Sequence, residues 1–384
     1  MINFEKNSKN FFVEEIFPGY GVIGLNQNIK KQGYGDYTWF SLQKEDWNTV
    51  DIAKTICRKL NVSKKRINYS GMKDRQATTT QLMSVWKVPP EKVMQMNITG
   101  VKINGAWNEE KDVKMGDAVG NRFKIVINTD SSIEKSVFDK YNQLDGIMPN
   151  YFGEQRFGML NNTNIVGKNI VIGDFEGAVK EYLCGGDSRL EKNEEAREAR
   201  ENLKKNWGDF GIAIKNYPKY LKYERTLLSH LTVYPKDYIG ALRKLPRKLS
   251  LLFVHSHQSS TFNEELRVRI EKNDHIILAD DNIAGLNEYM FPDEKKLVLN
   301  NHAGEKVTIK NGYYPLGIIH GYENGDESFK IKSFPEISSK GSNRFLFVPI
   351  VNFKFSENEN IGTFNFDLPS GSYATVALSL FTNE

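Results

Sequence analysis

The sequence has few of the residues that build disulfide frameworks or zinc sites. It contains two cysteines, Cys57 and Cys184, and six histidines among 384 residues. Two cysteines cannot form a disulfide framework or a four-cysteine zinc site. The sequence also lacks a run of about 18 apolar residues, which excludes a transmembrane helix. The first residues, MINFEKNSKNFF, contain no apolar segment followed by a small-residue cleavage site. We therefore expect no signal peptide, a reducing compartment and a cytoplasmic location.

The sequence has no large excess of charge of either sign, because it contains 52 basic and 48 acidic residues, a net charge of +4. The basic residues are nevertheless clustered. Residues 54–75 hold eight basic side chains and one acidic side chain, a net +7, and residues 236–248 hold five and one, a net +4. Concentrated positive charge suits a polyanion such as nucleic acid, although a solvated lysine-rich surface explains each cluster equally well on its own.

The length corresponds to about two domains, and the order of the expected elements indicates how they are arranged. Apolar residues alternate at 11–16, 79–88 and 123–127, which predicts strands, and they recur at helical spacing at 49–60 and 134–146. A mostly helical stretch follows, with two short strand candidates near its end, and the C-terminal part returns to strand. The expected helices are 174–184, 188–206, 225–231, 237–244 and 249–271, and the later strands are 297–300, 307–310, 344–355 and 363–369. This order favours an α+β sheet domain interrupted by a helical insertion.

Two segments carry residues suited to chemistry on a nucleic-acid base. In NYSGMKDRQATTTQ (68–81), Asp74 stands between Lys73 and Arg75, and flanking cations favour the ionised form of a carboxyl group. In GDAVGNRFKIVI (116–127), Asn121 and Phe123 are two residues apart at the start of a strand, so both side chains face the same way. An amide beside an aromatic ring can read a base edge and stack on its plane. The plainer explanation for Asp74 is a surface ion pair. For Asn121 and Phe123 it is a turn residue followed by a core residue.

Two further segments are rich in glycine, serine and aromatic residues. PNYFGEQRFG (149–158) brackets Gln155 and Arg156 with two Phe-Gly pairs and reads as a loop. LPSGSYATVA (368–377) joins a strand to a helix, with Ser372 as a candidate N-cap, and such a turn can bind an anion. For residues 149–158 the alternative is a loop packed between domains. For residues 368–377 the alternative is simple capping of the helix.

Taken together, these segments resemble the TruD family of pseudouridine synthases. Residues 69–81 follow the family pattern around its catalytic aspartate. GNRF at 120–123, PNYFGEQRFG at 149–158 and LPSGSYAT at 368–375 match three more family segments, and NFFVEE at 10–15 is similar to the family's N-terminal one. The matching segments keep their order over essentially the whole chain.

The resemblance implies a pseudouridine-synthase catalytic domain, with a mixed or antiparallel sheet and flanking helices, that is interrupted by a mainly helical TRUD insertion domain. We expect residues 1–153 and 339–384 to form the catalytic domain and residues 154–338 to form the insertion. The implied reaction is the isomerisation of uridine to pseudouridine in tRNA, at uridine 13 of the D-arm, without a cofactor or a metal. The implied partner is tRNA, with no membrane, and we expect a monomer.

The resemblance also implies roles for individual residues. Asp74 matches the catalytic aspartate, as nucleophile or as base. Phe11, Asn121 and Tyr373 match substrate-contacting positions, and Phe123 matches the aromatic residue that packs on the target base. The candidates for further RNA contacts are Lys73, Arg75, Gln155 and Arg156.

The cation that partners Asp74 is left open by the sequence. The family's N-terminal basic residue falls on Glu5 here, and Lys6 follows it. Because Lys73 precedes Asp74 on extended backbone, its side chain should point to the other side. We therefore do not assign Lys73 the ion pair with Asp74, and Lys6 is the candidate.

Two other classes of protein stay as alternatives. A non-catalytic RNA-binding protein or tRNA chaperone on the same fold would have no need of Asp74 beside Asn121 and Phe123. A metal-dependent nuclease would need clustered carboxylates, and the four segments offer Asp74 alone as a pocket carboxylate. His255 and His257 are two residues apart on an expected helix, hence on different faces, so we do not expect them to bind a metal.

Overall fold

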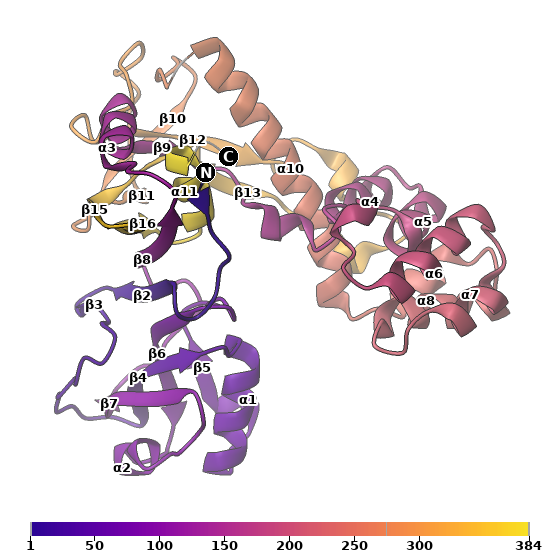
Figure 1. Cartoon of the computed structure of the whole chain (residues 1–384), viewed down its shortest axis with the longest axis horizontal. Coiled ribbons are helices and arrows are strands. Elements are labelled where there is room, and N and C mark those ends of the chain that lie inside the picture. Colours follow the sequence, from indigo (N-terminus) through magenta and orange to yellow (C-terminus); the bar gives the residue numbers. More distant parts are fainter. Residues whose placement is uncertain (1, 274, 383–384) are drawn as a thin grey trace.

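A mixed sheet joins the N-terminal part of the chain to its C-terminal end (Figure 1). In the computed structural model, residues 2–273 and 275–382 are described, and within them ten strands form this sheet, in the order β15-β16-β8-β2-β6-β4-β7 with β1, β3 and β5 paired to its members. The strands are β1 Ile2–Asn3, β2 Phe11–Phe17, β3 Gly21–Val22, β4 Tyr37–Glu45, β5 Ile67–Tyr69, β6 Thr78–Trp86, β7 Val101–Glu109, β8 Gly120–Thr129, β15 Val351–Asn358 and β16 Ile361–Pro369.

Strand β2 lies at the centre of this sheet. It pairs with β8 in the antiparallel sense, with Val13 opposite Phe123 and Glu15 opposite Asn121. On its other side it pairs with β6 in the parallel sense, with Phe12 opposite Thr78. Parallel pairing puts the starts of β2 and β6 at the same edge of the sheet. The segment before β2 and the loop that carries Asp74 therefore meet there.

Helices bury the two halves of the sheet in separate cores. Helix α1 (Thr49–Leu60) covers one half, where Ile52 and Ile56 belong to the same buried cluster as Phe40 and Met83. Its start is capped by Asn48, whose side-chain oxygen accepts a hydrogen bond from the amide of residue 51 at 2.8 Å. Helices α3 (Glu134–Gln143) and α11 (Ala374–Thr382) cover the other half. Helix α2 (Pro90–Met94) contacts β7 at the sheet's edge.

The middle of the chain forms a helical insertion with a core of its own. Most of its helices gather on the right of Figure 1. Leu227, Phe253 and Ile337 belong to its buried cluster. The helices are α4 Thr163–Val171, α5 Phe175–Cys184, α6 Glu194–Lys205, α7 Phe210–Asn216, α8 Lys222–Val233, α9 Tyr238–Arg243 and α10 Arg247–Asn273.

A second sheet follows the helices, in the order β11-β10-β12-β13. Its strands are β10 Asn282–Leu286, β11 Pro292–Val298, β12 Tyr314–Ile319 and β13 Ser342–Phe345. The chain leaves the main sheet by β9 (Ile147–Pro149) and returns by β14 (Phe347–Pro349), and these two strands pair with each other. The expected α+β fold with an insertion is confirmed, and the boundaries at 153/154 and 338/339 stay a prediction.

Two expectations about single elements are wrong. Residues 307–310 form no strand; the side chain of Val307 is buried, but the chain turns at 309–310. Ser372 does not cap the last helix, because α11 begins at Ala374. Its hydroxyl group instead donates a hydrogen bond to Oδ1 of Asn150 at 2.9 Å, so Ser372 ties two loops together.

The contact between α4 and α10 gives a test of how the insertion is joined to its long helix. A Cβ atom at Gly167 in α4 would lie 1.9 Å from the carbonyl oxygen of Phe253 in α10. We expect Gly167→Ala to lower the free energy of unfolding by about 1–3 kcal/mol, because the helices must separate. The matched control is Gly211→Ala in α7, where a Cβ atom would meet only a methyl group at 3.9 Å. Equal thermal or denaturant unfolding of the two variants would contradict this packing.

Candidate active site

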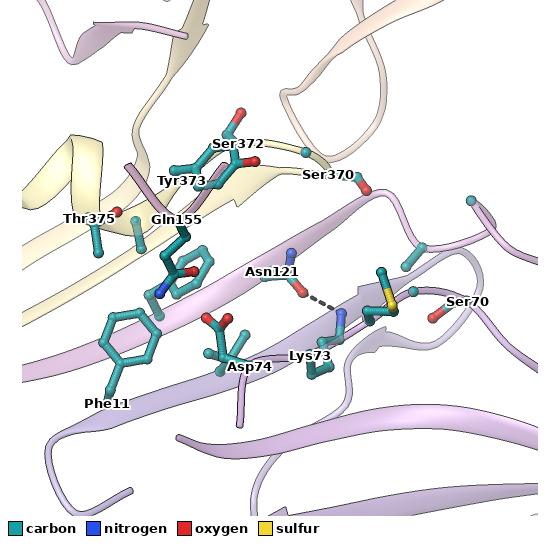
Figure 2. Close-up of a pocket in the computed structure, with 18 of the residues that line it drawn as sticks. Phe11, Ser70, Lys73, Asp74, Asn121, Gln155, Ser370, Ser372, Tyr373 and Thr375 are labelled. Atoms are coloured by element: carbon teal, nitrogen blue, oxygen red, sulfur yellow. Dashed lines mark hydrogen bonds between the residues drawn. The ribbon is translucent and has the colours of Figure 1, made fainter. Parts of the chain in front are cut away.

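A pocket of about 400 Å³ opens where β2, β8 and the loop before β6 meet. Figure 2 shows the side chains of Asp74, Asn121 and Gln155 facing a common space. Its other walls come from the segment before β2, from loop 70–74 and from loop 370–375, with Lys6, Phe11, Phe123 and Tyr373 among the lining residues. The four sequence segments singled out above therefore converge on one site.

Asp74 is held by a lysine from the N-terminal segment. The ammonium group of Lys6 lies 2.6 Å from Oδ2 of Asp74, and the Lys6 side chain is 12% exposed whereas that of Asp74 is 41% exposed. The same ammonium group lies 4.0 Å from the centre of the Phe11 ring. Lys6, and not Lys73, is thus the cation beside Asp74, and the carboxylate keeps a face open to the pocket.

Lys73 points to the other side of the loop, as the extended backbone predicts. Its ammonium group lies 2.9 Å from Oε1 of Glu15 and donates a hydrogen bond to Oδ1 of Asn121 at 2.6 Å. Glu15 is completely buried, and it also accepts hydrogen bonds from the Ser70 hydroxyl group and, at 2.9 Å, from the amide of Leu82. A buried ion pair therefore links β2, loop 70–74 and β8.

Aromatic rings form the floor of the pocket. The rings of Phe11 and Phe123 meet edge to face with 6.1 Å between their centres, and Phe123 also packs against Phe366. Both Phe11 and Phe123 are almost completely buried. Tyr373 stands on the opposite wall, next to Phe152. A flat ring with an aromatic face, such as a nucleobase, suits these surfaces.

The other sequence candidates are divided between two places. Gln155, in the short 3-10 helix Glu154–Phe157, lines the pocket, and Arg75 lines a neighbouring hollow of about 480 Å³ that also contains Asp74. Arg156 lies outside both, because its Nε donates a hydrogen bond to the Ser259 hydroxyl group of α10 at 3.0 Å. The structure thus brings Arg75 and Gln155 to the pocket region and places Arg156 against the insertion.

Sequence reasoning missed Arg344, which clamps two of the matched segments. Its guanidinium group donates hydrogen bonds to the carbonyl oxygens of Asn150 at 2.9 Å and of Gly371 at 3.0 Å. It also lies 4.0 Å from the centre of the Phe152 ring, and burial lowers its pKa to about 10. No local pattern marks Arg344, because its partners are distant in sequence.

Lys44 in β4 was missed too, although it lies directly beneath the loop of Asp74. It is completely buried. Its ammonium group donates hydrogen bonds to the carbonyl oxygens of Trp47 at 2.6 Å and of Asp74 at 2.7 Å. Burial lowers the pKa of Lys44 to about 8, and the nearby Asp74 partly opposes that shift. In the sequence, this residue looks like an ordinary charge at the end of a strand.

Lys44 gives a prediction for stability against pH. Its pKa of about 8 in the folded protein is below the ordinary 10.5, so between these values the unfolded chain binds more protons and stability rises with pH. Relative to Lys44→Met, the wild-type free energy of unfolding should increase by up to about 3 kcal/mol across this window. Denaturant titrations at several pH values measure the difference. Lys59→Met, at an exposed lysine of α1, is the control, and a pH-independent difference for Lys44→Met would contradict the assignment.

Metal-ligand clusters and membrane-spanning helices are both missing from the part of the chain that the structure describes. Among the described residues, no group of three or more His, Cys, Asp and Glu side chains could hold a metal ion. His255 and His257 are both in α10, and burial lowers the pKa of each. In the same part of the chain, no helix has the length and apolar character to cross a membrane.

The fold and the pocket are consistent with an enzyme that acts on a flat ring, and comparison with known proteins identifies the class and the family. The family model described as tRNA pseudouridine synthase D (TruD) matches residues 3–325 and 318–380. The chain therefore belongs to the TruD family of pseudouridine synthases, and the resemblance found in the sequence is confirmed.

Relatives and a solved structure agree with this membership. A probable tRNA pseudouridine synthase D of Methanopyrus kandleri is 33% identical over 355 residues, covering 90% of this chain and 85% of the relative. Another from Methanococcus vannielii is 32% identical, with 99% and 95% covered. A crystal structure from Methanosarcina mazei, described as a putative tRNA pseudouridine synthase D, superimposes with a TM-score of 0.74 at 31% identity and covers 99% of this chain and 93% of that one.

Proposed function

We propose that this protein isomerises uridine to pseudouridine in tRNA, at uridine 13 of the D-arm, with Asp74 as the catalytic residue. The observation that carries the proposal is the pocket itself. Asp74 provides the only carboxylate among its described lining residues, and it stands beside an amide and aromatic rings suited to a base. Family membership supports the reaction and the class of substrate.

The geometry supports a role for each side chain in the isomerisation. The bond between C1′ and N1 of the nucleotide must break, and C5 must then bond to C1′. The C5 proton is lost after this bond forms, and N1 takes up a proton, so the reaction is a net isomerisation. Ionised Asp74 can attack C1′ as a nucleophile or remove the proton from C2′ as a base, and Lys6 at 2.6 Å holds its second oxygen. We assign Asn121 to the edge of the base, with Phe11 and Tyr373 as walls of the pocket.

The target base must leave the RNA stack to reach Asp74, because chemistry at C1′ and C5 is blocked inside a helix. Phe123 lines the pocket, and we infer that the detached uracil rests on its ring while it rotates. An aromatic face has no preferred hydrogen-bonding direction, so it tolerates rotation of the base.

A group of exposed lysines on the same part of the chain as Asp74 suits the tRNA backbone. The exposed lysines Lys59, Lys64 and Lys65 lie on α1 and the turn that follows it, and strand β5 connects this turn to loop 70–75. Because phosphate contacts release counterions, affinity for RNA should depend on salt. We propose that this surface positions the tRNA.

A non-catalytic RNA-binding protein is the alternative function. It would use the same basic surface and pocket without chemistry at Asp74. The observation against it is the tight ion pair between Lys6 and Asp74, which places a carboxylate where binding of an anionic RNA gains nothing from it. A catalytic role explains why Asp74 is in the pocket, whereas simple RNA binding does not.

Replacing Asp74 tests the proposed function directly. We expect the wild-type protein to produce pseudouridine at one position of the tRNA D-arm and Asp74→Asn to produce none, because the amide is neither a nucleophile nor a base. Binding of tRNA should stay within several-fold of wild type. Pseudouridine mapping and filter binding measure both quantities, with Asp139→Asn on the exposed face of α3 as the control. Turnover by Asp74→Asn would exclude the mechanism.

The proposed RNA surface is tested by its salt dependence. We expect Lys59→Gln/Lys65→Gln to weaken tRNA binding and to reduce the slope of log affinity against log salt by about one for each phosphate that the variant no longer neutralises. Lys135→Gln on α3 should leave the slope unchanged. An identical slope in the double variant and the wild type would show that this surface does not contact the phosphates.

A further inference from the structure

The amide of Asn121 lies between a buried cation and the open pocket. The ammonium group of Lys73 is 2.6 Å from Oδ1 of Asn121 and donates a hydrogen bond to it. The Lys73 side chain is only 7% exposed, so it has little freedom to turn toward a phosphate group of the RNA. This placement differs from that of a surface lysine such as Lys65.

The neighbouring cation fixes which end of the amide faces the pocket. An ammonium group has three donors and no acceptor, so the oxygen of Asn121 must face Lys73. The NH₂ group therefore points away, and Figure 2 shows it on the side of loop 370–373. Among the described residues, no acceptor forms a hydrogen bond with this nitrogen. Asn121 thus presents a hydrogen-bond donor to the pocket and no acceptor.

Glu15 keeps the cation in place. It is opposite Asn121 in the pairing of β2 with β8, and its carboxylate lies 2.9 Å from the ammonium group of Lys73. Hydrogen bonds from Ser70 and from the amide of Leu82 satisfy the rest of this buried carboxylate. A buried charge that is paired and hydrogen-bonded on every side holds one geometry.

We propose that Lys73, fixed by Glu15, is a positioning residue that sets the amide of Asn121 so that its NH₂ group donates to a carbonyl oxygen of the flipped base. This inference rests on the proposed function and deepens it, since it states how the pocket recognises uracil. Lys73 was a candidate for contact with RNA, and here it acts on the substrate only through Asn121.

A fixed donor has a consequence for the choice of base. Uracil presents carbonyl oxygens at C2 and C4, whereas cytosine carries an amino group at C4. A donor aimed at O4 would meet another donor in cytosine and leave both groups unpaired, which is costly in a closed pocket. A donor aimed at O2 would contribute to binding without this discrimination. The experiment separates the two oxygens.

The test uses tRNA carrying 2-thiouridine or 4-thiouridine at the target position, because sulfur is a poorer acceptor than oxygen. We expect one of the two substitutions to lower kcat/KM of the wild type by about tenfold, the effect of weakening one hydrogen bond in a closed site. In Asn121→Ala the same substitution should have an effect of less than about threefold, because the donor is absent. In Lys73→Met the effect should shrink as well, because the amide is free to turn over. A loss of the sulfur effect in Lys73→Met is a readout that general damage to the fold would not produce.

The outcomes distinguish the inference from the proposed function. If the wild type converts unmodified tRNA but the sulfur effects are the same in Asn121→Ala, or persist unchanged in Lys73→Met, the inference is wrong and the proposed function stands. If the wild type produces no pseudouridine in any tRNA, both fail. Should Lys73→Met not fold, Glu15→Gln/Lys73→Met removes both buried charges and carries the same expectation.

Discussion

The site depends on the buried ion pair between Lys73 and Glu15. Glu15 is fully buried and the Lys73 side chain nearly so, so each needs the other to offset its loss of hydration. The pair fastens loop 70–74 to the central strand β2. The loop is also held by the amide of Lys73, which donates to the Thr49 hydroxyl group at 2.9 Å, and by Lys44 beneath the carbonyl group of Asp74. Asp74 can therefore face the pocket on a loop that cannot move far.

The topology of the sheet brings the remaining parts of the site to the same place. The parallel pairing of β2 with β6 sets the N-terminal segment with Lys6 beside the loop of Asp74, and the antiparallel pairing with β8 sets Asn121 opposite Glu15. Arg344 then joins the loop that follows β9 to the loop between β16 and α11. Residues separated by almost the whole chain become neighbours through two strand pairings and one clamp.

The sequence predicted those features that depend on a local pattern of residues, such as strand positions and side-chain directions. Alternation of Phe123, Ile125 and Ile127 predicted β8 and put Asn121 and Phe123 on one side, and extended backbone predicted that Lys73 and Asp74 point apart. It did not predict features that depend on contacts between residues distant in the sequence. Lys44 and Arg344 look like surface charges until the fold buries them. The second sheet was largely missed because its strands are short, and β11 is mostly exposed, so apolar alternation is weak. The N-cap position at Ser372 failed because a tertiary hydrogen bond to Asn150 took its hydroxyl group.

The most direct test of the central claim is a structure of Asp74→Asn bound to tRNA, which would stop the reaction before chemistry. The account predicts that uridine 13 is rotated out of the D-arm stack, with its base against Phe123, an oxygen of the base facing the NH₂ group of Asn121, and C1′ beside residue 74. A complex in which every nucleotide of the D-arm stays stacked, and the pocket between Asp74, Asn121 and Tyr373 holds no base, would contradict it.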